Sequence, residues 1–491
     1  MKWLVHSATF GLTAFLAATL IAVSPTWSAE KERNDTTGLD LERIQRKWTG
    51  DLDGMTERHM IRALVIYSKT FYFLDGATQR GATYDALHAF EEELNRKLGK
   101  KVRRVQVVFI PVSRDELLPA LREGRGDLVA ANLTITPERK QLVDFSEPVY
   151  TGVSELVVTG PGAPAIKSID DLAGKTVLVR KSSSYYENLE HLNAKLRKAG
   201  KKSVKIKLAP EQLEDEDLLE MVNAGLVPII IVDSHKAKFW AQILKSIDVH
   251  EDVAVRQGGD IAWAFRRNSP KLAAAANTFI ETHRKGTQFG NILYRRYLES
   301  TKWVESATSK EELAKFERTL DLFKKYAGQY EFDWLMLAAL GYQESRLDQS
   351  VRSPVGAIGV MQLMPTTGAA MKVGDVKQIE PNIHAGTKYM RTILDTYFAD
   401  AKMDELNRNL FAFASYNAGP TRVSGLRKEA EKRGLDPDVW FGSVERIAAE
   451  KIGRETVQYV SNIYKYYVAY KLILEERAET KAARKEVSGK P

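Results

Sequence analysis

Cysteine is missing from all 491 residues of the sequence. This absence excludes disulfide bridges, a catalytic thiol and a lipid-carrying cysteine behind an export signal. Histidine is scarce as well: the chain has eight, and His384 has no second histidine at metal-ligand spacing. Neither a phosphate-binding glycine loop nor a serine–histidine–aspartate pattern is present. We therefore predict no metal and no cofactor.

Long apolar runs are missing too. Residues 10–23 form an apolar stretch after the basic Lys2, but it is shorter than the roughly 20 residues of a membrane-spanning helix. A proline and several small residues follow it, which is typical of a cleaved export signal. We expect residues 1–29 to be this signal. The mature protein is then expected to be exported, and to be soluble or peripherally attached to a membrane.

The charge balance is positive, with 72 lysines and arginines against 64 acidic residues and a formal net charge of +8. Such a balance suits an anionic partner, whether nucleic acid, a lipid surface or an acidic polymer. No compact basic patch with interleaved aromatic residues stands out, so we predict no nucleic-acid partner. Hydrophobic residues make up 44% of the chain, which has the length of roughly two to four domains.

After a polar leader at residues 30–57, the chain alternates between strand-like and helix-like segments. Residues 83–99 and 113–127 show the helical spacing of apolar residues, the second with Ser113 as its N-cap. The strand-like segments are rich in β-branched residues and cover 61–68, 102–112, 128–136, 154–160, 174–180 and 227–233. This alternation predicts an α/β architecture with largely parallel strands.

The segment DELLPALREGRGDLVAANLTITPERKQLVDFSEPVY, residues 115–150, resembles the amino-acid-binding type of family 3 periplasmic solute-binding proteins. The resemblance extends over roughly residues 58–300 and implies a two-lobed clamp. In that family an arginine holds the ligand's carboxylate, which its planar fork fits in a bidentate way. A hydroxylic loop of the second lobe assists, and an aspartate pairs with the ligand's amino group. The matching residues here are Thr134, Thr136, Arg139, Ser183, Ser184 and Asp233.

The match has departures. RKSSSYY, residues 180–186, stands where the family has a glycine–threonine signature, and the first-lobe aromatic segment is not closely matched. An ion pair with Glu138 or Asp144 is the alternative role for Arg139. The fold therefore carries over better than the ligand, which we expect to be a small amino-acid-like molecule or a muropeptide.

From residue 303 the sequence becomes all-helical in pattern. EFDWLMLAALGYQESRLD, residues 331–348, predicts a helix with Asp333 as its N-cap. An apolar stripe runs along one face of this helix, and Glu344 continues it three residues after Gly341. A carboxylate on a core-facing stripe is costly unless it is satisfied or neutral. Because burial raises a carboxyl pKa, Glu344 is predicted to be a proton donor near neutral pH.

Glycoside hydrolysis normally needs a second carboxylate, as a nucleophile or a base. The nearest candidate, Asp348, lies one turn further on, where the helix is expected to end. We interpret Asp348 as a solvated or capping residue. A mechanism with one acid then requires that the substrate supply its own nucleophile.

Residues 330–470 closely resemble the catalytic domain of soluble lytic murein transglycosylases, which is itself similar to goose-type lysozyme. Five ordered segments carry the match: GYQESRLD, SPVGAIGVMQLMP, PNIHAGTKYM, ASYNAGP and ETVQYVSNI. The resemblance implies that Glu344 protonates the bond between N-acetylmuramic acid and N-acetylglucosamine in peptidoglycan glycan strands. Glu344 then takes a proton from the muramoyl C6 hydroxyl, which closes on C1 and leaves a 1,6-anhydro end without using water.

The same resemblance implies further residues around the acid. Ser345 matches a position that assists at the substrate's N-acetyl group, and Glu455 matches a supporting carboxylate. The two cleft walls are matched by Gly359, Met361 and Gln362 on one side and by Tyr416 and Asn417 on the other. We expect the Tyr416 hydroxyl to lie near the acid. The alternatives are that Met361 and Tyr416 are core residues and that Glu455 forms an ion pair along its helix.

A solute-binding module followed by such a catalytic domain resembles the arrangement of the membrane-bound lytic murein transglycosylase F family. This implies a multidomain fold with a regulatory α/β domain at 58–302, an all-α lysozyme-like domain at 303–475 and a charged tail at 476–491 that frays from a helix. It also implies a periplasmic lyase, peripherally associated with the outer membrane, whose first domain regulates the second. A lysozyme-like hydrolase and a solute-sensing or glycan-binding protein are the alternatives.

Overall fold

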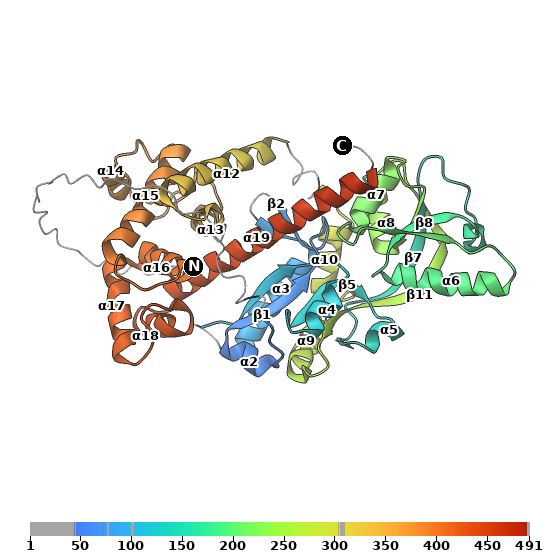
Figure 1. Ribbon diagram of the computed structural model, residues 1–491, viewed down its shortest axis with the longest axis horizontal. Helices are drawn as coiled ribbons and strands as arrows, with labels where there is room; N and C mark the ends of the chain where they lie inside the picture. Colours follow the sequence, from blue (N-terminus) through green and yellow to red (C-terminus); the bar gives the residue numbers. More distant parts are fainter. Residues whose placement is uncertain are drawn as a thin grey trace, which may run out of the picture. The chain divides into compact units, whose positions relative to one another are not determined.

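The computed structural model describes residues 44, 46–75, 78–99, 103–302, 304 and 310–488 (Figure 1). All of them fall within one compact unit of the chain, Leu39–Pro491. The expected signal peptide at residues 1–29 lies outside the described residues.

The end of the expected polar leader is ordered and partly buried. Helix α2 (Leu52–Glu57) begins at Asp51, whose side chain accepts a hydrogen bond of 2.7 Å from the backbone N–H of Leu52. Met55 on this helix is fully buried, and the Trp48 ring lies 3.8 Å beneath the guanidinium of Arg58. These apolar anchors, which are isolated in a polar sequence, attach the segment to the first lobe of the α/β region.

A nine-stranded mixed sheet runs through the α/β region, in the order β4-β1-β5-β11-β7-β10-β8-β9 with β6 beside β11. Its strands are β1 (Met60–Val65), β4 (Gln106–Pro111), β5 (Leu128–Thr134), β6 (Asp144–Phe145), β7 (Tyr150–Thr159), β8 (Thr176–Arg180), β9 (Lys205–Ala209), β10 (Ile229–Asp233) and β11 (Asp248–Phe265). A separate hairpin pairs β2 (Phe73–Asp75) with β3 (Thr78–Arg80).

The sheet is less parallel than the sequence predicted. Strand β1 pairs in parallel with β4 and β5, and β8 pairs in parallel with β9 and β10. The long strands β7 and β11 are antiparallel to their neighbours and to each other, and they join these two groups. Each parallel group keeps the strand–helix alternation expected from the sequence. The two connecting strands are antiparallel because they cross between the lobes.

Helices pack on both groups of strands. They are α3 (Ala82–Lys97), α4 (Leu117–Arg122), α5 (Pro137–Lys140), the 3₁₀ turn η1 (Ile169–Leu172), α6 (Ser184–Lys198), α7 (Asp215–Asn223), α8 (Ser234–Ala241), α9 (Pro270–His283) and α10 (Gln288–Leu298). Helix α4 is shorter than the predicted helix at 113–127, and the Ser113 hydroxyl donates to Asp115 instead of capping it. Pro119 fits only near a helix start, which sets the late beginning of α4.

The C-terminal region is helical, as predicted. Its elements are α12 (Lys310–Tyr330), α13 (Trp334–Ser345), α14 (Pro365–Met371), α15 (Ile379–Tyr397), α16 (Glu405–Ala418), α17 (Pro420–Lys432), the π turn η2 (Trp440–Val444), α18 (Glu445–Lys451) and α19 (Arg454–Ser488). Helix α13 is central, because every residue from Leu335 to Tyr342 is buried. Within the part of the chain that the structure describes, no helix has the length and apolar character needed to cross a membrane.

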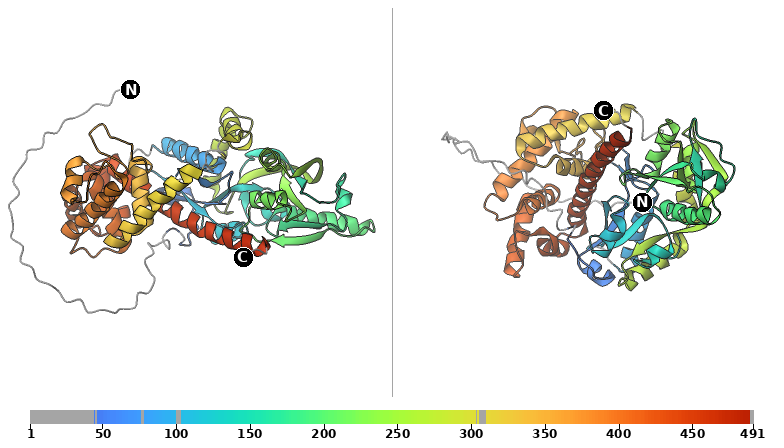
Figure 2. Two further views of the ribbon diagram at one scale, coloured as in Figure 1. Left: turned by 90° about the horizontal axis from the view of Figure 1, so that it is seen from above. Right: turned by 45° about the vertical axis from the view of Figure 1, so that its right-hand side comes forward.

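Helix α19 continues through the tail that was expected to fray. It runs unbroken for 35 residues (Figures 1 and 2), and its second half is rich in alanine, glutamate, lysine and arginine, all strong helix formers. Near its end, Arg484 donates hydrogen bonds to Asp217 and, at 3.2 Å, to Glu220. Both carboxylates belong to α7 in the α/β region. One helix therefore contacts both parts of the protein.

Candidate functional site

Glu344 lies at the end of helix α13, as predicted. Asp333 caps the start of this helix by accepting a 2.8 Å hydrogen bond from the Leu335 N–H. After Ser345 the chain turns sharply, because Arg346 and Leu347 adopt φ values of +57° and +63°. Non-glycine residues rarely hold this backbone conformation, and it costs on the order of 1–3 kcal/mol at each position. The strained turn ends the helix directly behind the half-buried Glu344.

The environment of Glu344 favours its protonated form. Burial raises the pKa of Glu344 to about 7, while a hydrogen bond donated by the Tyr459 hydroxyl to Oε1 lowers that pKa in part. A carboxyl with a pKa near the working pH can both donate and accept a proton. Glu344 therefore has the properties of a general acid and base.

Tyr459 was not singled out from the sequence, although it lies in the quoted segment ETVQYVSNI. It is buried on α19, whereas the predicted Glu455 is exposed in the first turn of the same helix. Residues four apart lie on one helix face, so Glu455 lies on the same face of α19 as Tyr459. The four-residue spacing between Glu455 and Tyr459 was the sequence feature from which a role for Tyr459 could have been predicted.

Tyr416 lies beside the acid but does not bond to it. Its hydroxyl donates a 2.7 Å hydrogen bond to the Met361 carbonyl. Burial, and then the charge of Glu344, raise the pKa of both Tyr416 and Tyr459. Two phenols that stay protonated therefore flank Glu344, and the one that donates to its carboxylate is Tyr459.

The glycine-rich loop is held against α13 by backbone and side-chain hydrogen bonds. Ser345 donates to the Val360 carbonyl at 2.9 Å, so its hydroxyl ties the end of α13 to the loop. Gly359 has a φ of +76°, and a Cβ there would come within 2.7 Å of the Asn382 side chain. Gln362 has a φ of +44° and donates to the Gly359 carbonyl at 2.8 Å. The turn therefore requires glycine and fixes the backbone beside the acid.

Met361 contributes its backbone to the site, and its side chain packs in the core. The side chain is fully buried, and a methyl group on Gly386 would come within 2.8 Å of its Cβ, Cγ and Cε. This packing corresponds to the alternative weighed above and differs from the expected apolar cleft wall. Asn417 accepts a 2.6 Å hydrogen bond from the Thr456 hydroxyl, which ties α16 to the first turn of α19.

Asp348 is exposed and serves a local turn. Its Oδ1 accepts hydrogen bonds from the backbone N–H and the hydroxyl of Ser350, at 2.8 and 2.7 Å. The interpretation of Asp348 as a solvated or capping residue agrees with this geometry. A carboxylate engaged in this way is a poor second catalytic group for the acid.

Replacing Tyr459 by phenylalanine is expected to raise the pKa of Glu344 further, because the ionised carboxylate loses its donor. The acid then stays protonated to higher pH, so the alkaline limb of the pH–rate profile shifts to higher pH. Initial rates of cleavage of the glycan strands that the family resemblance implies as substrate, from about pH 5 to about pH 9, measure this limb. Tyr397→Phe, which removes an exposed phenol, is the matched control. An unmoved alkaline limb would contradict the assignment.

The predicted clamp residues meet in the α/β region. Arg139 is buried and donates 2.9 Å hydrogen bonds to the carbonyls of Thr134 and Ser182, which lie in different lobes. Its ion-pair partner is Glu187 at 3.5 Å, and not Glu138 or Asp144. Arg139 thus connects the first lobe to the loop that begins α6.

A small cavity of about 20 Å³ lies between these groups, which is room for about one water molecule. Five of the six predicted residues line it: Thr134, Arg139, Ser183, Ser184 and Asp233. Thr136 does not, because its side chain caps α5 by accepting from the Arg139 N–H. Ser183 in turn caps α6 through a 3.2 Å hydrogen bond from the Tyr186 N–H. An amino acid would therefore enter only if the lobes moved apart.

A buried network of charges adjoins this cavity and was missed from the sequence. Lys236 donates to Asp215 at 2.6 Å, Arg180 also binds Asp215, and Arg114 pairs with Glu214 at 2.7 Å. Burial opposes the charge on Asp215, but Lys236 and Arg180 hold its pKa well below the usual range. These residues are far apart in sequence and lie in no motif, so no local pattern signalled the network.

An apolar cavity of about 130 Å³ lies beside the small one and shares Asn132 with it. Apolar side chains make up most of its lining, which includes the aromatic residues Phe71, Tyr150, Trp263 and Tyr294. Together the two cavities offer charged groups at one end and an apolar surface at the other.

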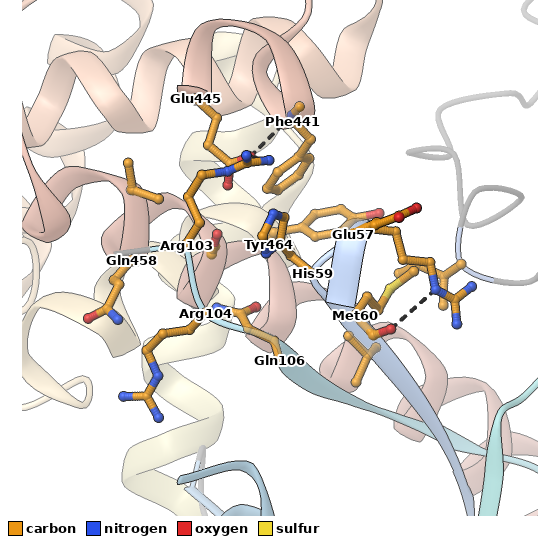
Figure 3. Close-up of a pocket in the computed structure, with 16 residues that line it drawn as sticks. Glu57, His59, Met60, Arg103, Arg104, Gln106, Phe441, Glu445, Gln458 and Tyr464 are labelled. Carbon is orange, nitrogen blue, oxygen red and sulfur yellow. Dashed lines mark hydrogen bonds and ion pairs between the residues drawn. The ribbon is translucent and has the colours of Figure 1, made fainter. Parts of the chain in front are cut away.

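A third cavity, of about 150 Å³, lies near the starts of β1 and β4, beside α18 and α19 (Figure 3). Three arginines line it, and each has a carboxylate close by. Arg103 lies 3.7 Å from Glu445, while Arg58 and Arg104 bind Asp127 and Glu92. No residue predicted from the sequence lines this cavity, and we assign it no ligand.

His384, the histidine inside a motif, packs among tyrosines. Its Nε2 shares a 2.8 Å hydrogen bond with the Tyr330 hydroxyl, and its ring stacks on Tyr326. Across the described ranges, no group of three or more histidine, cysteine or acidic side chains is arranged to hold a metal ion.

Comparisons with known proteins match both regions. Residues 321–438 match the family described as "Transglycosylase SLT domain", and residues 68–300 match "Bacterial extracellular solute-binding proteins, family 3". The membrane-bound lytic murein transglycosylase F of Shewanella halifaxensis is 30% identical over 427 residues, covering 82% of this chain and 84% of that protein. Its namesake in Desulfosudis oleivorans is 29% identical over 413 residues, covering 81% and 86%. An ancestral arginine-binding protein bound to arginine is 26% identical, with a TM-score of 0.40 over 49% of this chain and 98% of that one.

Proposed function

The chain belongs to the membrane-bound lytic murein transglycosylase F family, and we propose that it is a peptidoglycan lyase in which Glu344 acts first as acid and then as base. Glu344 protonates the oxygen between N-acetylmuramic acid and N-acetylglucosamine, and this bond breaks. The resulting carboxylate takes a proton from the muramoyl C6 hydroxyl, whose oxygen closes on C1. The 1,6-anhydro product forms without water, and Glu344 ends protonated as it began.

The observation that supports this proposal most is the raised pKa of the half-buried Glu344. Its pKa of about 7 allows both proton transfers at neutral pH. Asp348, the nearest predicted carboxylate, faces solvent and holds a turn, so the intramolecular hydroxyl takes the place of a second carboxylate. The remaining site residues shape the cleft: Gly359 and Gln362 form one wall, Tyr416 and Asn417 the other, and Glu455 its rim.

Mass spectrometry of the sugars released from purified peptidoglycan tests the reaction. We expect anhydro-muramoyl ends, which are lighter than reducing ends by one water. Reducing ends would mean a lysozyme-like hydrolase that uses the same acid. Binding to glycan without release of sugars would mean a glycan-binding or sensing protein.

For the clamp we propose a small amino-acid-like ligand. Arg139 provides a guanidinium for a carboxylate, with the hydroxyls of Thr134, Ser183 and Ser184 close by. Asp233 is 2% exposed, lines the same cavity and has no hydrogen-bond partner at Oδ1, so it can accept from an amino group. The aromatic cavity next to it suits an apolar side chain. A muropeptide remains the competing ligand.

We place the mature protein in the periplasm, peripherally associated with the outer membrane, after cleavage of the signal at residues 1–29. The domain limits 58–302 and 303–475 belong to the same proposal. The net charge of +8 supports loose association with anionic peptidoglycan. This association weakens as salt screens the charges.

We also propose that the clamp regulates the lyase through α19. This helix carries Tyr459, the partner of Glu344, near one end and Arg484, the partner of α7, near the other. Lobe movements that admit a ligand shift α7 relative to the first lobe. The helix connects that change to the acid, which is a route for coupling between two sites.

Arg484→Ala is expected to keep the basal rate of glycan cleavage within about twofold, because Arg484 is remote from the acid. We expect it to lose the change in rate that saturating L-leucine produces in the wild type, since it removes the contact with Asp217 and Glu220. Lys481→Ala, an exposed position on the same helix, is the control. Equal wild-type rates with and without bound ligand, with binding shown by calorimetry, would end the coupling proposal.

A further inference from the structure

Two carboxyl groups lie side by side in the clamp, and the function proposed so far uses only one of them. Glu155 on β7 pairs in register with Asp233 on β10. Directly opposed residues of antiparallel strands point to the same face, with Cβ atoms roughly 5 Å apart. The exposed fraction is 1% for Glu155 and 2% for Asp233. Two acids are therefore enclosed side by side, and one of them, Asp233, lines the cavity where the ligand is expected to bind.

Each carboxyl has one oxygen satisfied by the protein and one that is not. Asn188 donates to Glu155 Oε2 at 2.8 Å, and Asn132 donates to Asp233 Oδ2 at 2.9 Å. Glu155 Oε1 and Asp233 Oδ1 are buried without a hydrogen-bond partner. A buried acceptor left without a donor is costly, and native proteins rarely keep one without a reason. Two such oxygens on neighbouring strands indicate a missing donor that both can share.

Several charged or titratable groups face this pair. Arg139 on α5 interacts with both acids but is also paired with Glu187. Burial lowers the pKa of His235 on α8 to about 4, so this neighbour of Asp233 is neutral. Arg256 on β11 is the other cross-strand neighbour of Glu155, but its guanidinium donates to the Ile135 carbonyl at 3.1 Å. Lys236 on α8 lies 3.5 Å from Asp233 but binds Asp215 more closely. From α6, Ser184 and Asn188 hydrogen-bond the Glu155 carboxyl and lower its pKa in part. The Tyr185 hydroxyl accepts from the Asp233 backbone N–H, and Glu187 pairs with Arg139. Burial and then Asp233 raise the pKa of Glu155 to about 7.

We propose that Glu155 and Asp233 together receive one primary ammonium group of the ligand, so that the clamp selects ligands with a free amine and rejects N-acylated ones. This inference rests on the clamp being an amino-acid-type receptor. An ammonium group has three donors and no acceptor, enough to satisfy Oε1 and Oδ1 and leave one N–H for a neighbour. An acylated nitrogen has one donor and no charge, and would leave one of the two oxygens unsatisfied.

The proposal includes a proton that leaves on binding. Without ligand and below about pH 7, Glu155 carries a proton. When the ammonium enters, it replaces that proton as the neutralising charge, and the proton goes to solvent. Ligand binding therefore strengthens as pH rises through the pKa of Glu155. For a group titrating near pH 7 that must be ionised, the affinity rises about tenfold from about pH 6 to about pH 8.

Isothermal titration of the full chain tests this. The probes are L-leucine and L-arginine, each with its N-acetyl derivative, at about pH 6 and about pH 8 in buffers of different ionisation enthalpy. We expect about tenfold tighter binding of at least one free amino acid at the higher pH, release of close to one proton near pH 6, and no binding of the N-acetyl forms. Glu155→Gln is expected to bind with the same affinity at both pH values and to release no proton. Asp233→Asn is expected to lose binding.

Other outcomes separate the inference from the function beneath it. Wild-type affinity that is equal at both pH values, without proton release, overturns the role of Glu155 and leaves an amino-acid clamp that uses Asp233 alone. N-acetyl probes that bind as tightly as the free amino acids overturn the selection for a free amine. No binding of any probe by the wild type overturns the amino-acid clamp and this inference together. If Glu155→Gln melts early, Glu155→Asp is used, and it must keep the pH dependence.

Discussion

The Glu344→Gln variant is expected to cleave glycan strands about 10²–10⁴-fold more slowly than the wild type, because general acid–base catalysis contributes about that factor. The amide has nearly the shape of the carboxyl group and can still pair with the Tyr459 hydroxyl. It cannot deliver a proton to the glycosidic oxygen or take one from the C6 hydroxyl. The measurement is the initial rate at which anhydro-muramoyl ends appear. Asp348→Asn, an exposed carboxylate next to the same loop, is the matched control and should stay within about twofold.

The same variant should be more stable than the wild type at alkaline pH. The folded protein raises the pKa of Glu344 from 4.5 to about 7, so folding disfavours its charged form. The contribution of Glu344 to the free energy of unfolding is therefore fully present below pH 4.5. It is lost as pH rises through about 7. Glutamine removes that loss, which is on the order of 2–3 kcal/mol at about pH 8. A variant that is inactive and also less stable at that pH would have lost the fold, and its inactivity would not identify the acid.

Asp127→Asn is expected to destabilise the protein by about 3–5 kcal/mol, since it leaves buried charges without their counter-charge. Asp127 is fully buried and lies 2.9 Å from Arg62 and 3.6 Å from Arg266, while Arg58 binds its Oδ2. Arg62 also supports the segment before α2 by donating to the carbonyl of Arg46 at 2.7 Å. The loss of one carboxylate therefore affects β1 and the ordered end of the polar leader together.

Urea unfolding followed by tryptophan fluorescence measures this effect. The control is Asp170→Asn, which breaks an exposed ion pair with Lys201 and should change the free energy of unfolding by less than about 1 kcal/mol. If both variants unfold at the wild-type urea midpoint, the protein does not need Asp127 to balance the three arginines. The expected loss of stability would then be wrong.

Features with a local period were predictable from the sequence. The stripe that ends in Glu344 and the cap at Asp333 follow from helical spacing, and the structure has both. The strands were found because β-branched runs are recognisable within a few residues. Their mixed directions were not, because the direction of β7 and β11 depends on how two lobes connect. The length of α19 was underestimated because charged, helix-forming residues also occur in coil, and Arg484 finds its partners on α7, far back in the sequence.

The site residues also fall into two groups, those predictable from the sequence and those found only in the structure. Arg139, Ser183, Ser184 and Asp233 came from a family resemblance, and the structure brings them to one cavity. Glu155 carries no motif, and its importance depends on its register with Asp233. Tyr459 stood within a quoted segment, yet its bond to Glu344 joins positions 115 residues apart. Pairs of this kind become visible only when separate helices or strands are placed side by side.

The position of α19 after α13 in the chain has a consequence for how the protein is made. Synthesis proceeds from the N-terminus, so α13 and its acid leave the ribosome well before Tyr459 and Arg484. A chain interrupted before residue 454 contains Glu344 without the phenol that binds it and without the contact on α7. In this architecture the acid is translated before the segment that completes its environment.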